Sequence, residues 1–297
     1  MKNRARFTML VLALVLLAGP LSLPNANAYV LDLDPPELTL RIVRDDNISR
    51  SPDGEGEKSD MVFIPALSVE RQAQVGEHTF TRTSLKLEGA IHERYRKLNR
   101  VTPVLGSGLR HHLGDGLADP VLRLDLALGY DFYDQDSRFG AFIEPRIEIR
   151  ARIEDRVDIA LHYAYDNRFA SEKKVFDVEG HSIGVTADLE FTEDAFFVLG
   201  YEYRRGDVVV HTRNPTEPPE AYFQPPVRGE RLPLYTFKER YTAVHLSDAD
   251  THTVTIGLRY YWNLYTELHA GFTYEEIRKD SVDYPSNQFF LAVKHSL

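Results

Sequence analysis

The chain has 297 residues, no cysteine and a formal net charge of −10 at pH 7. The lack of cysteine excludes disulfide frameworks, cysteine-ligated zinc sites and thiol nucleophiles. The acidic balance argues against nucleic acid as a partner. Only the N-terminal segment has an apolar stretch near the length that a membrane-spanning helix needs, so a helical membrane protein is excluded.

Residues 1–28 have the pattern of a Sec-type secretory signal. Three basic residues precede an apolar core at 7–17, and Ala26-Asn27-Ala28 presents the small residues that signal peptidase recognises. We therefore predict cleavage after Ala28. The alternative is an anchoring N-terminal helix, which is disfavoured because the apolar core is too short to span a bilayer.

The rest of the chain alternates between apolar and polar residues with a period of two, and 121–133 shows it most clearly. Leu122, Leu124, Leu126 and Leu128 share one face there, whereas Arg123 and Asp125 share the other. This period is typical of strands, since a helix would scatter both sets around its circumference. We expect twelve strands, at about 37–45, 61–71, 78–94, 102–112, 121–133, 139–153, 157–165, 183–191, 197–203, 254–262, 264–274 and 289–297.

These strands are connected by links that alternate in length, short and then mostly long. An outer-membrane barrel has short periplasmic turns and longer external loops, whereas a soluble sandwich has no reason for such a pattern. Several of the expected strands are also longer than those of ordinary globular proteins. The sequence therefore predicts an all-β fold, a single antiparallel up-and-down transmembrane barrel of about twelve strands over 37–297, with a periplasmic lead-in at 29–36. The longest external loop is expected at 206–250, a proline-rich segment that either folds into the mouth or is mobile.

The polar face of the strands is expected to line the lumen. Candidate lining residues are Arg123, Asp125, Glu144, Arg146, Glu148, Arg150, Arg152, Asp158, His162, Arg259, Glu267 and His269. The expected turns pair Asp125 with Arg146, Arg123 with Glu148, Arg152 with Asp158, and Arg259 with Glu267 across neighbouring strands. The two charges of each pair either neutralise each other in a wet lumen, or the pairs form a charged constriction that selects solutes.

Aromatic residues gather near the ends of the strands on the apolar face, as an interfacial girdle requires. The girdle candidates are Tyr130, Phe132, Phe139, Tyr163, Tyr165, Tyr201, Tyr203, Tyr260, Trp262 and Tyr274. Outer-membrane lipid and lipopolysaccharide are the expected contacts of this face. The last strand is the expected signal for the barrel-assembly machinery, although it ends in Leu297.

The alternating strands and the terminal strand make the chain resemble a bacterial outer-membrane β-barrel protein. More narrowly, Arg44-Asp45-Asp46-Asn47-Ile48, Lys58-Ser59-Asp60 and the 201–207 stretch are similar to a group of uncharacterised, porin-like proteobacterial barrels. This resemblance implies location in the bacterial outer membrane. It also implies porin-like function, and some barrels of this kind belong to polysaccharide export systems.

Three functions follow as hypotheses. The preferred one is a narrow porin-like channel for small hydrophilic solutes, and the second is a closed barrel with a surface-binding or envelope-structural role. The third is a lipid hydrolase, which is disfavoured because His295 and Ser296 point to opposite faces of one strand. We predict no catalytic residue, cofactor or metal ligand, although the acidic first loop could offer oxygen ligands to calcium.

Overall fold

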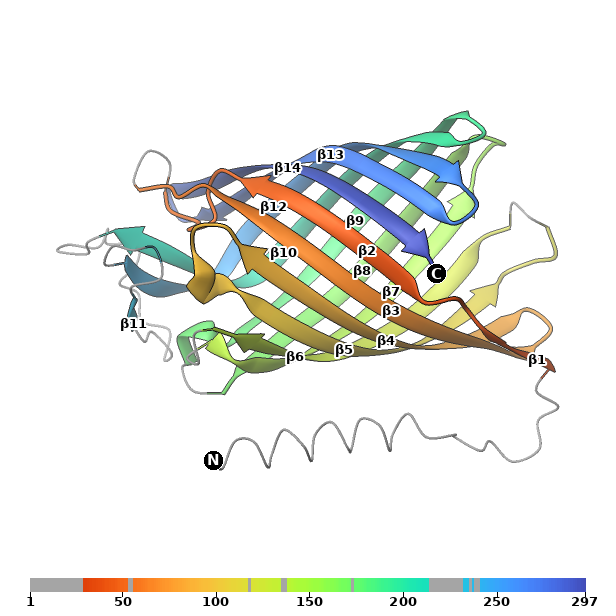
Figure 1. Cartoon of the computed structure of the whole chain (residues 1–297), viewed down its shortest axis with the longest axis horizontal. Coiled ribbons are helices and arrows are strands. Elements are labelled where there is room, and N and C mark those ends of the chain that lie inside the picture. Colours follow the sequence, from red (N-terminus) through yellow and green to blue (C-terminus); the bar gives the residue numbers. More distant parts are fainter. Residues whose placement is uncertain are drawn as a thin grey trace.

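The computed structural model describes residues 29–52, 56–116, 119–134, 138–171, 174–213, 232–234, 237 and 241–297. Within them, twelve antiparallel strands close into one barrel, whose strands run obliquely to its long axis (Figure 1). The ring closes because its last strand, β14 (Val282–Ser296), pairs with its first, β2 (Glu37–Asp45). The twelve-stranded barrel predicted from the alternation is thus confirmed. The predicted signal peptide and its cleavage site lie outside the described residues.

The strands of the ring follow one another in chain order. They are β2 (Glu37–Asp45), β3 (Asp60–Gly76), β4 (Thr79–His92), β5 (Arg100–His112), β6 (Val121–Tyr133), β7 (Gly140–Arg152), β8 (Val157–Ala170), β9 (Val178–Thr192), β10 (Ala195–Arg213), β12 (Tyr241–Asn263), β13 (Thr266–Lys279) and β14 (Val282–Ser296). Two short 3-10 helices, η1 (Arg96–Leu98) and η3 (Lys174–Phe176), lie in the connections. No helix among the described residues is long and apolar enough to cross a bilayer.

Two short strands lie outside the ring. β1 (Tyr29–Leu33) falls in the predicted lead-in and pairs with the end of β3, near Arg71 and Gln74. β11 (Leu232–Leu234) pairs with the start of β12. Figure 1 shows β1 at the end of the barrel that carries the short turns, and β11 at the opposite end. We call these the turn end and the mouth end.

The outer surface of the barrel is apolar. On β6, Leu124, Leu126 and Leu128 are exposed, whereas Arg123 and Asp125 alternate with them and point inward. Exposed large apolar side chains also occur on most of the other barrel strands, for example Leu85, Ile149, Ile256 and Leu291. An apolar band around a closed barrel is the surface that a bilayer covers.

At the mouth end the strands continue farther than their sequence patterns predicted. β10 runs to Arg213 and β12 begins at Tyr241, so both extend into the segment that was expected to be a loop at 206–250. The link between β13 and β14 was expected to be long, because the predicted strands end at 274 and begin again at 289, but it is only the turn at 280–281. Asp280 adopts the left-handed conformation there (φ 55°), which aspartate tolerates better than most residues.

Candidate functional site

The inward face of the barrel carries ion pairs between strands that are not neighbours. Arg82 on β4 contacts Asp125 on β6 at 2.8 Å, and Arg259 on β12 contacts Asp188 on β9 at 2.7 Å. Arg204 on β10 reaches Asp166 on β8 at 2.8 Å in the same way. Each pair reaches past an intervening strand, which side chains can do readily only on the concave face of a curved sheet. These charged residues therefore point into the lumen.

Glu148 on β7 is the most densely contacted carboxylate of this face. Arg146 lies 3.0 Å from it, Arg150 3.5 Å and Arg123 3.6 Å. Glu148 itself is buried, whereas its arginines are only partly so. One carboxylate thus compensates part of three positive charges on the wall of the lumen.

Three of the four predicted cross-strand positions are confirmed. Asp125 lies opposite Arg146, Arg123 opposite Glu148, and Arg152 opposite Asp158. The closest ion pairs nevertheless differ from these positions, because long side chains reach diagonally. Asp125 contacts Arg82, and Arg152 contacts Glu190 at 2.9 Å.

The fourth prediction is wrong, since Arg259 lies opposite His269 and not Glu267. The turn was expected at Asn263 alone, but it is formed by 264–265. Asn263 uses its side-chain oxygen to accept the N–H of Tyr265 at 2.8 Å. This turn and the irregularity in the register beside it shift the pairing by two residues.

The other predicted lining residues occupy varied surroundings. His162 is buried and lies 2.9 Å from Glu202 on β10, two strands away. His269 packs edge to face on Phe290, which also carries the guanidinium of Arg41 over its ring. Glu144, Asp158 and Glu267 are half-buried.

Several of the predicted girdle residues form contacts on the outer face. Tyr130 packs against Phe132, and Phe132 against Phe139. The hydroxyls of Tyr163 and Tyr201 are hydrogen-bonded to His181 and His252, at 2.6 and 3.0 Å. Near the turn end Tyr260 packs against the exposed Trp262. Their contact with lipid remains a prediction.

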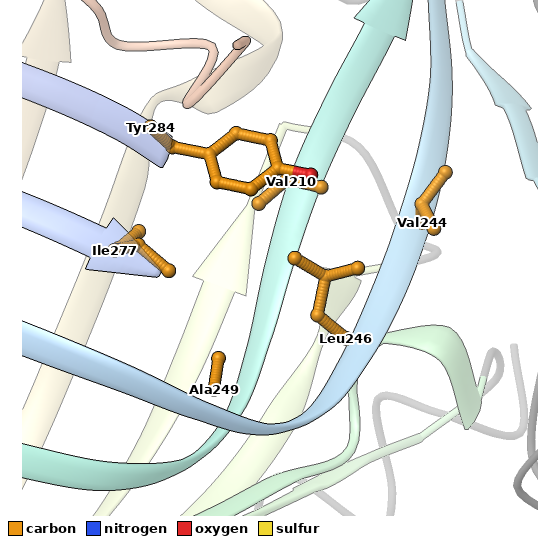
Figure 2. Close-up of a cluster of buried hydrophobic side chains, with 6 residues drawn as sticks. All are labelled: Val210, Val244, Leu246, Ala249, Ile277 and Tyr284. Carbon is orange, nitrogen blue, oxygen red and sulfur yellow. The ribbon is translucent and has the colours of Figure 1, made fainter. Parts of the chain in front are cut away.

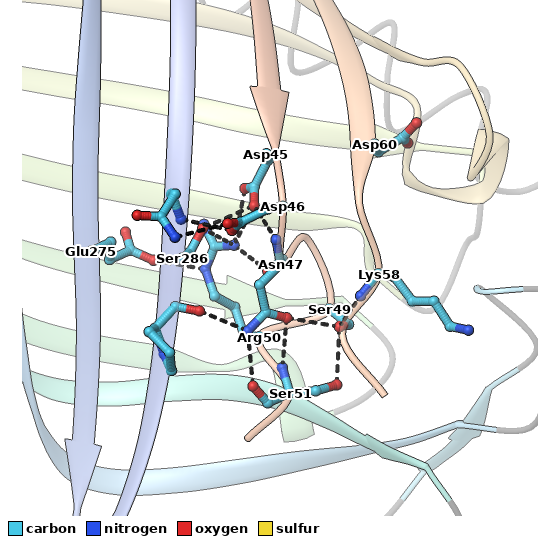
Figure 3. Close-up of polar contacts among 12 residues, drawn as sticks. Asp45, Asp46, Asn47, Ser49, Arg50, Ser51, Lys58, Asp60, Glu275 and Ser286 are labelled. Atoms are coloured by element: carbon cyan, nitrogen blue, oxygen red, sulfur yellow. Dashed lines mark hydrogen bonds and ion pairs between the residues drawn. The ribbon is translucent and has the colours of Figure 1, made fainter. Parts of the chain in front are cut away.

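The first loop folds into the mouth, which the sequence did not reveal. Asn47, Ser49 and Ser51 are almost fully buried, and the amide of Asn47 donates to the carbonyls of Ser51 and Pro285, both at 2.8 Å. Figure 3 shows this network between the loop and β14. A loop that only surrounded the mouth would leave these side chains in water.

Arg50 belongs to the same loop and has a left-handed backbone conformation (φ 50°). It forms ion pairs with Asp45 at 2.9 Å and with Glu275 on β13 at 2.7 Å. Burial alone would lower the pKa of Arg50, but the two carboxylates raise it overall. Because Asp45 is paired with Arg50 and Asp46 is bound to Asn287, these two acidic residues are engaged within the protein rather than arranged for calcium.

The extensions of β10 and β12 form the second part of the mouth, a hairpin over 206–213 and 241–250. Val210, Ala243 and Ala249 are fully buried, and the cluster containing Val210, Leu246 and Ala249 packs against Ile277 and Tyr284 (Figure 2). The pairing of the two strands slips between Gly206 and Val208. A side chain at Gly206 would collide with the backbone of Glu179 and Gly180, so the close approach requires glycine.

His211 ties this hairpin to connections on both sides of the ring. Its Nε2 lies 2.6 Å from Arg138, between β6 and β7, and its Nδ1 lies 2.9 Å from the carbonyl of Ser49, between β2 and β3. Because arginine can only donate, Nε2 accepts, and Nδ1 carries the proton that is donated to Ser49. Phe237 packs edge to face on His211 and on Tyr95. The hairpin therefore lies across the mouth, and we call this hairpin with residues 47–51 the mouth cover.

A cavity of about 380 Å³ lies between the mouth cover and the inward faces of the strands. Four arginines line it: Arg50, Arg138, Arg168 and Arg204. Asp207 and Glu275 contribute carboxylates, and Tyr133, Phe176, Val208 and Ile277 contribute aromatic and apolar surface. None of the four arginines was among the residues predicted from sequence. They share no motif and meet only in the folded barrel.

No protein-family model and no curated protein sequence matches the chain. Its structure is similar to the COG4313 outer membrane channel from Pseudomonas putida F1, with a TM-score of 0.55 and 7% identity over 92% of this chain and 99% of that one. The NanC porin is less similar, with a TM-score of 0.46 and 9% identity over 88% of this chain and all of that one, and adds nothing to the assignment. At these identities the likeness concerns the fold, and this chain has the fold of an outer-membrane β-barrel.

Proposed function

We propose that the protein is a narrow, porin-like channel for small hydrophilic solutes in a bacterial outer membrane. The observation that carries the proposal is the accessibility of inward-facing side chains. Lys86 keeps 44% of its side-chain surface exposed, Arg82 42% and Arg146 36%. Side chains that filled a barrel as a packed core would be almost wholly buried. The interior of this barrel has room for water instead.

Two further cavities support a wet lumen toward the turn end. One of about 220 Å³ lies on the wall that includes Glu70, Arg82 and Asp125, and one of about 400 Å³ lies on the wall that includes Thr39, Glu267 and Lys294. Both are lined by charged groups of either sign, which suits polar solutes in general. The mouth cover narrows the opposite end, so we propose that it sets the size limit.

The placement in the membrane is part of the proposal. The apolar band supports contact with lipid, and the tyrosine, phenylalanine and tryptophan contacts near the strand ends support a girdle beside the head groups. We further propose that lipopolysaccharide covers the part of this surface near the mouth end, and that the barrel-assembly machinery receives β14. Separation of inner and outer membranes of expressing cells tests the location.

The channel itself is tested by single-channel recording with the refolded barrel in planar bilayers. We expect small, discrete current steps, and swelling of liposomes in arabinose but much less in a tetrasaccharide. A shift of the folded band on heating, seen on a gel, checks that the barrel is intact. An intact barrel that carries no current would contradict the channel, and the same preparation unfolded by boiling is the control.

A second function, a closed barrel with a surface-binding or envelope-structural role, is favoured by one observation. The mouth cover is built from buried side chains and a continuous hydrogen-bond network, and not from a loop that merely overhangs the mouth. Under this proposal an intact barrel conducts no current at any voltage. The two functions thus predict opposite results in one recording.

A further inference from the structure

Arg138 differs from the other three arginines of the mouth cavity. Arg50 is paired with Asp45 and Glu275, Arg168 with Asp131, and Arg204 with Asp166. Arg138 donates to the neutral ring of His211 and lies over the ring of Phe176, 4.7 Å from its centre. Among the described residues, no carboxylate forms an ion pair with it.

The side chain of Arg138 therefore carries a positive charge that the described residues do not compensate. Its Nε is fully enclosed and has no hydrogen-bond partner. Burial lowers the pKa of Arg138 to about 10; the nearby Tyr133 raises it, and the neighbouring Arg168 lowers it. An enclosed, unpaired guanidinium is costly unless an anion approaches it, and its planar fork matches the two oxygens of a carboxylate.

The cavity beside Arg138 also has surface for the body of a ligand. Tyr133 and Phe176 contribute aromatic rings, and Val208, Val209 and Ile277 contribute aliphatic groups. Its volume of about 380 Å³ is in the range of sites for small molecules. Glu275 and Asp207 are partly satisfied by Arg50 and His245, so they leave Arg138 available to a ligand.

We propose that this cavity is a binding site for a small organic acid, whose carboxylate is held by Arg138 and whose apolar body lies against Phe176 and Val208. The biological meaning of the site rests on the proposed channel function: small organic acids would be the solutes that the channel captures beneath the mouth cover. Binding itself does not require transport, and the two can therefore fail separately.

The test is calorimetric titration of the refolded barrel in detergent with benzoate, and with benzamide as its uncharged analogue. We expect benzoate to bind and benzamide to bind at least about tenfold more weakly, since only benzoate pairs with the guanidinium. Arg138→Gln should weaken benzoate binding by about tenfold or more and leave benzamide unchanged. Arg156→Gln, in an exposed turn at the other end of the barrel, is the matched control and should bind benzoate like the wild type.

Stability separates a binding role from a structural one. Arg138→Gln leaves no carboxylate unpaired, and the amide of the glutamine can still donate to His211, so this variant should unfold near the wild-type temperature without benzoate. Arg204→Gln should unfold at a lower temperature, because it leaves Asp166 unpaired. Equal binding of benzoate and benzamide, or wild-type affinity in Arg138→Gln, would overturn the proposal. Benzoate binding by a barrel that carries no current would keep the site and reject the channel.

Discussion

Glu148 shows how single residues shape this lumen. Its carboxylate lies within 3.6 Å of three arginines that come from two strands, and it is far more buried than they are. The arginines are partly exposed to the lumen, so losing the carboxylate costs each of them little. The buried carboxylate would lose more if its arginines were removed, because it cannot be solvated instead. We therefore expect Glu148 to influence both the local stability and the local charge of this part of the lumen wall.

Replacing Glu148 with glutamine should lower the free energy of unfolding by about 1–3 kcal/mol, because three arginines lose a charged acceptor. It should also shift the reversal potential of the channel toward anions. Unfolding in urea and recordings across a salt gradient measure the two effects. Asp158→Asn is the control, since Arg152 opposite it pairs with Glu190, and similar losses in both variants would contradict this account.

At this scale the sequence predicted which residues face inward, but not what they contact. Alternation assigns Arg123 and Asp125 to one face. Together with the expected length of the turn, it also predicts their positions opposite Glu148 and Arg146. It does not reveal that Asp125 reaches Arg82 two strands away, because that contact depends on the curvature of the closed sheet. Arg138 was missed for a similar reason, since its cavity is formed by segments distant in sequence.

Among the elements, the hairpin extension of β10 and β12 has the clearest functional consequence. It leaves the barrel wall at the slip between Gly206 and Val208, and it is held in place by His211 and by packing on Ile277 and Tyr284. Its position decides whether the mouth end is covered. The close backbone approach at Gly206 is the point at which that position is most sensitive to substitution.

Gly206→Ala should displace the hairpin at a cost of about 1–3 kcal/mol, because its new methyl group meets the backbone of Glu179. We expect a larger single-channel conductance and more frequent openings than in the wild type. Gly200→Ala is the matched control in the same strand, since its methyl group would meet only ordinary contacts at 3.6 Å or more. Wild-type conductance in Gly206→Ala would argue against the hairpin as the limiting element.

The bounds of a strand could be predicted well only where the sequence pattern was regular. β6 has the predicted limits of 121 and 133, because strict alternation is followed by turn residues. The extension of β10 has the sequence pattern of a loop, because the consecutive apolar residues at 208–210 break the alternation and prolines follow. The tight turn after Lys279 was not predicted because the charged residues Glu275, Glu276 and Arg278 resemble a loop, although they belong to a strand beyond the apolar band.

For the whole molecule, the outer band determines where the barrel can reside. Leu126 lies near the centre of β6 and is exposed, while its neighbour Ala127 points inward and lies opposite Glu144. The same strand thus presents one residue to the surroundings of the barrel and the next to its interior. This arrangement allows the membrane assignment to be tested by a single pair of substitutions.

Leu126→Arg should destabilise the barrel in lipid by about 2–4 kcal/mol, the cost of a cation at the middle of a bilayer. Ala127→Arg places the same side chain at the same depth in a wet lumen beside Glu144, and should cost much less. Reversible unfolding in liposomes measures both. Equal losses would contradict the assignment of the two faces.

The first loop also links the mouth to the order in which the molecule assembles. Its residues bind β13 and β14: Asn47 binds Pro285, Asp46 binds Asn287, and Arg50 binds Glu275. These contacts connect the first loop of the barrel with its last two strands. Contacts between segments so distant in sequence are expected to form late in folding. The seam between β2 and β14 and the mouth cover should then be completed together. A newly inserted barrel would be at its most permeable before its seam closes, and closure of the seam would also be what restricts its mouth.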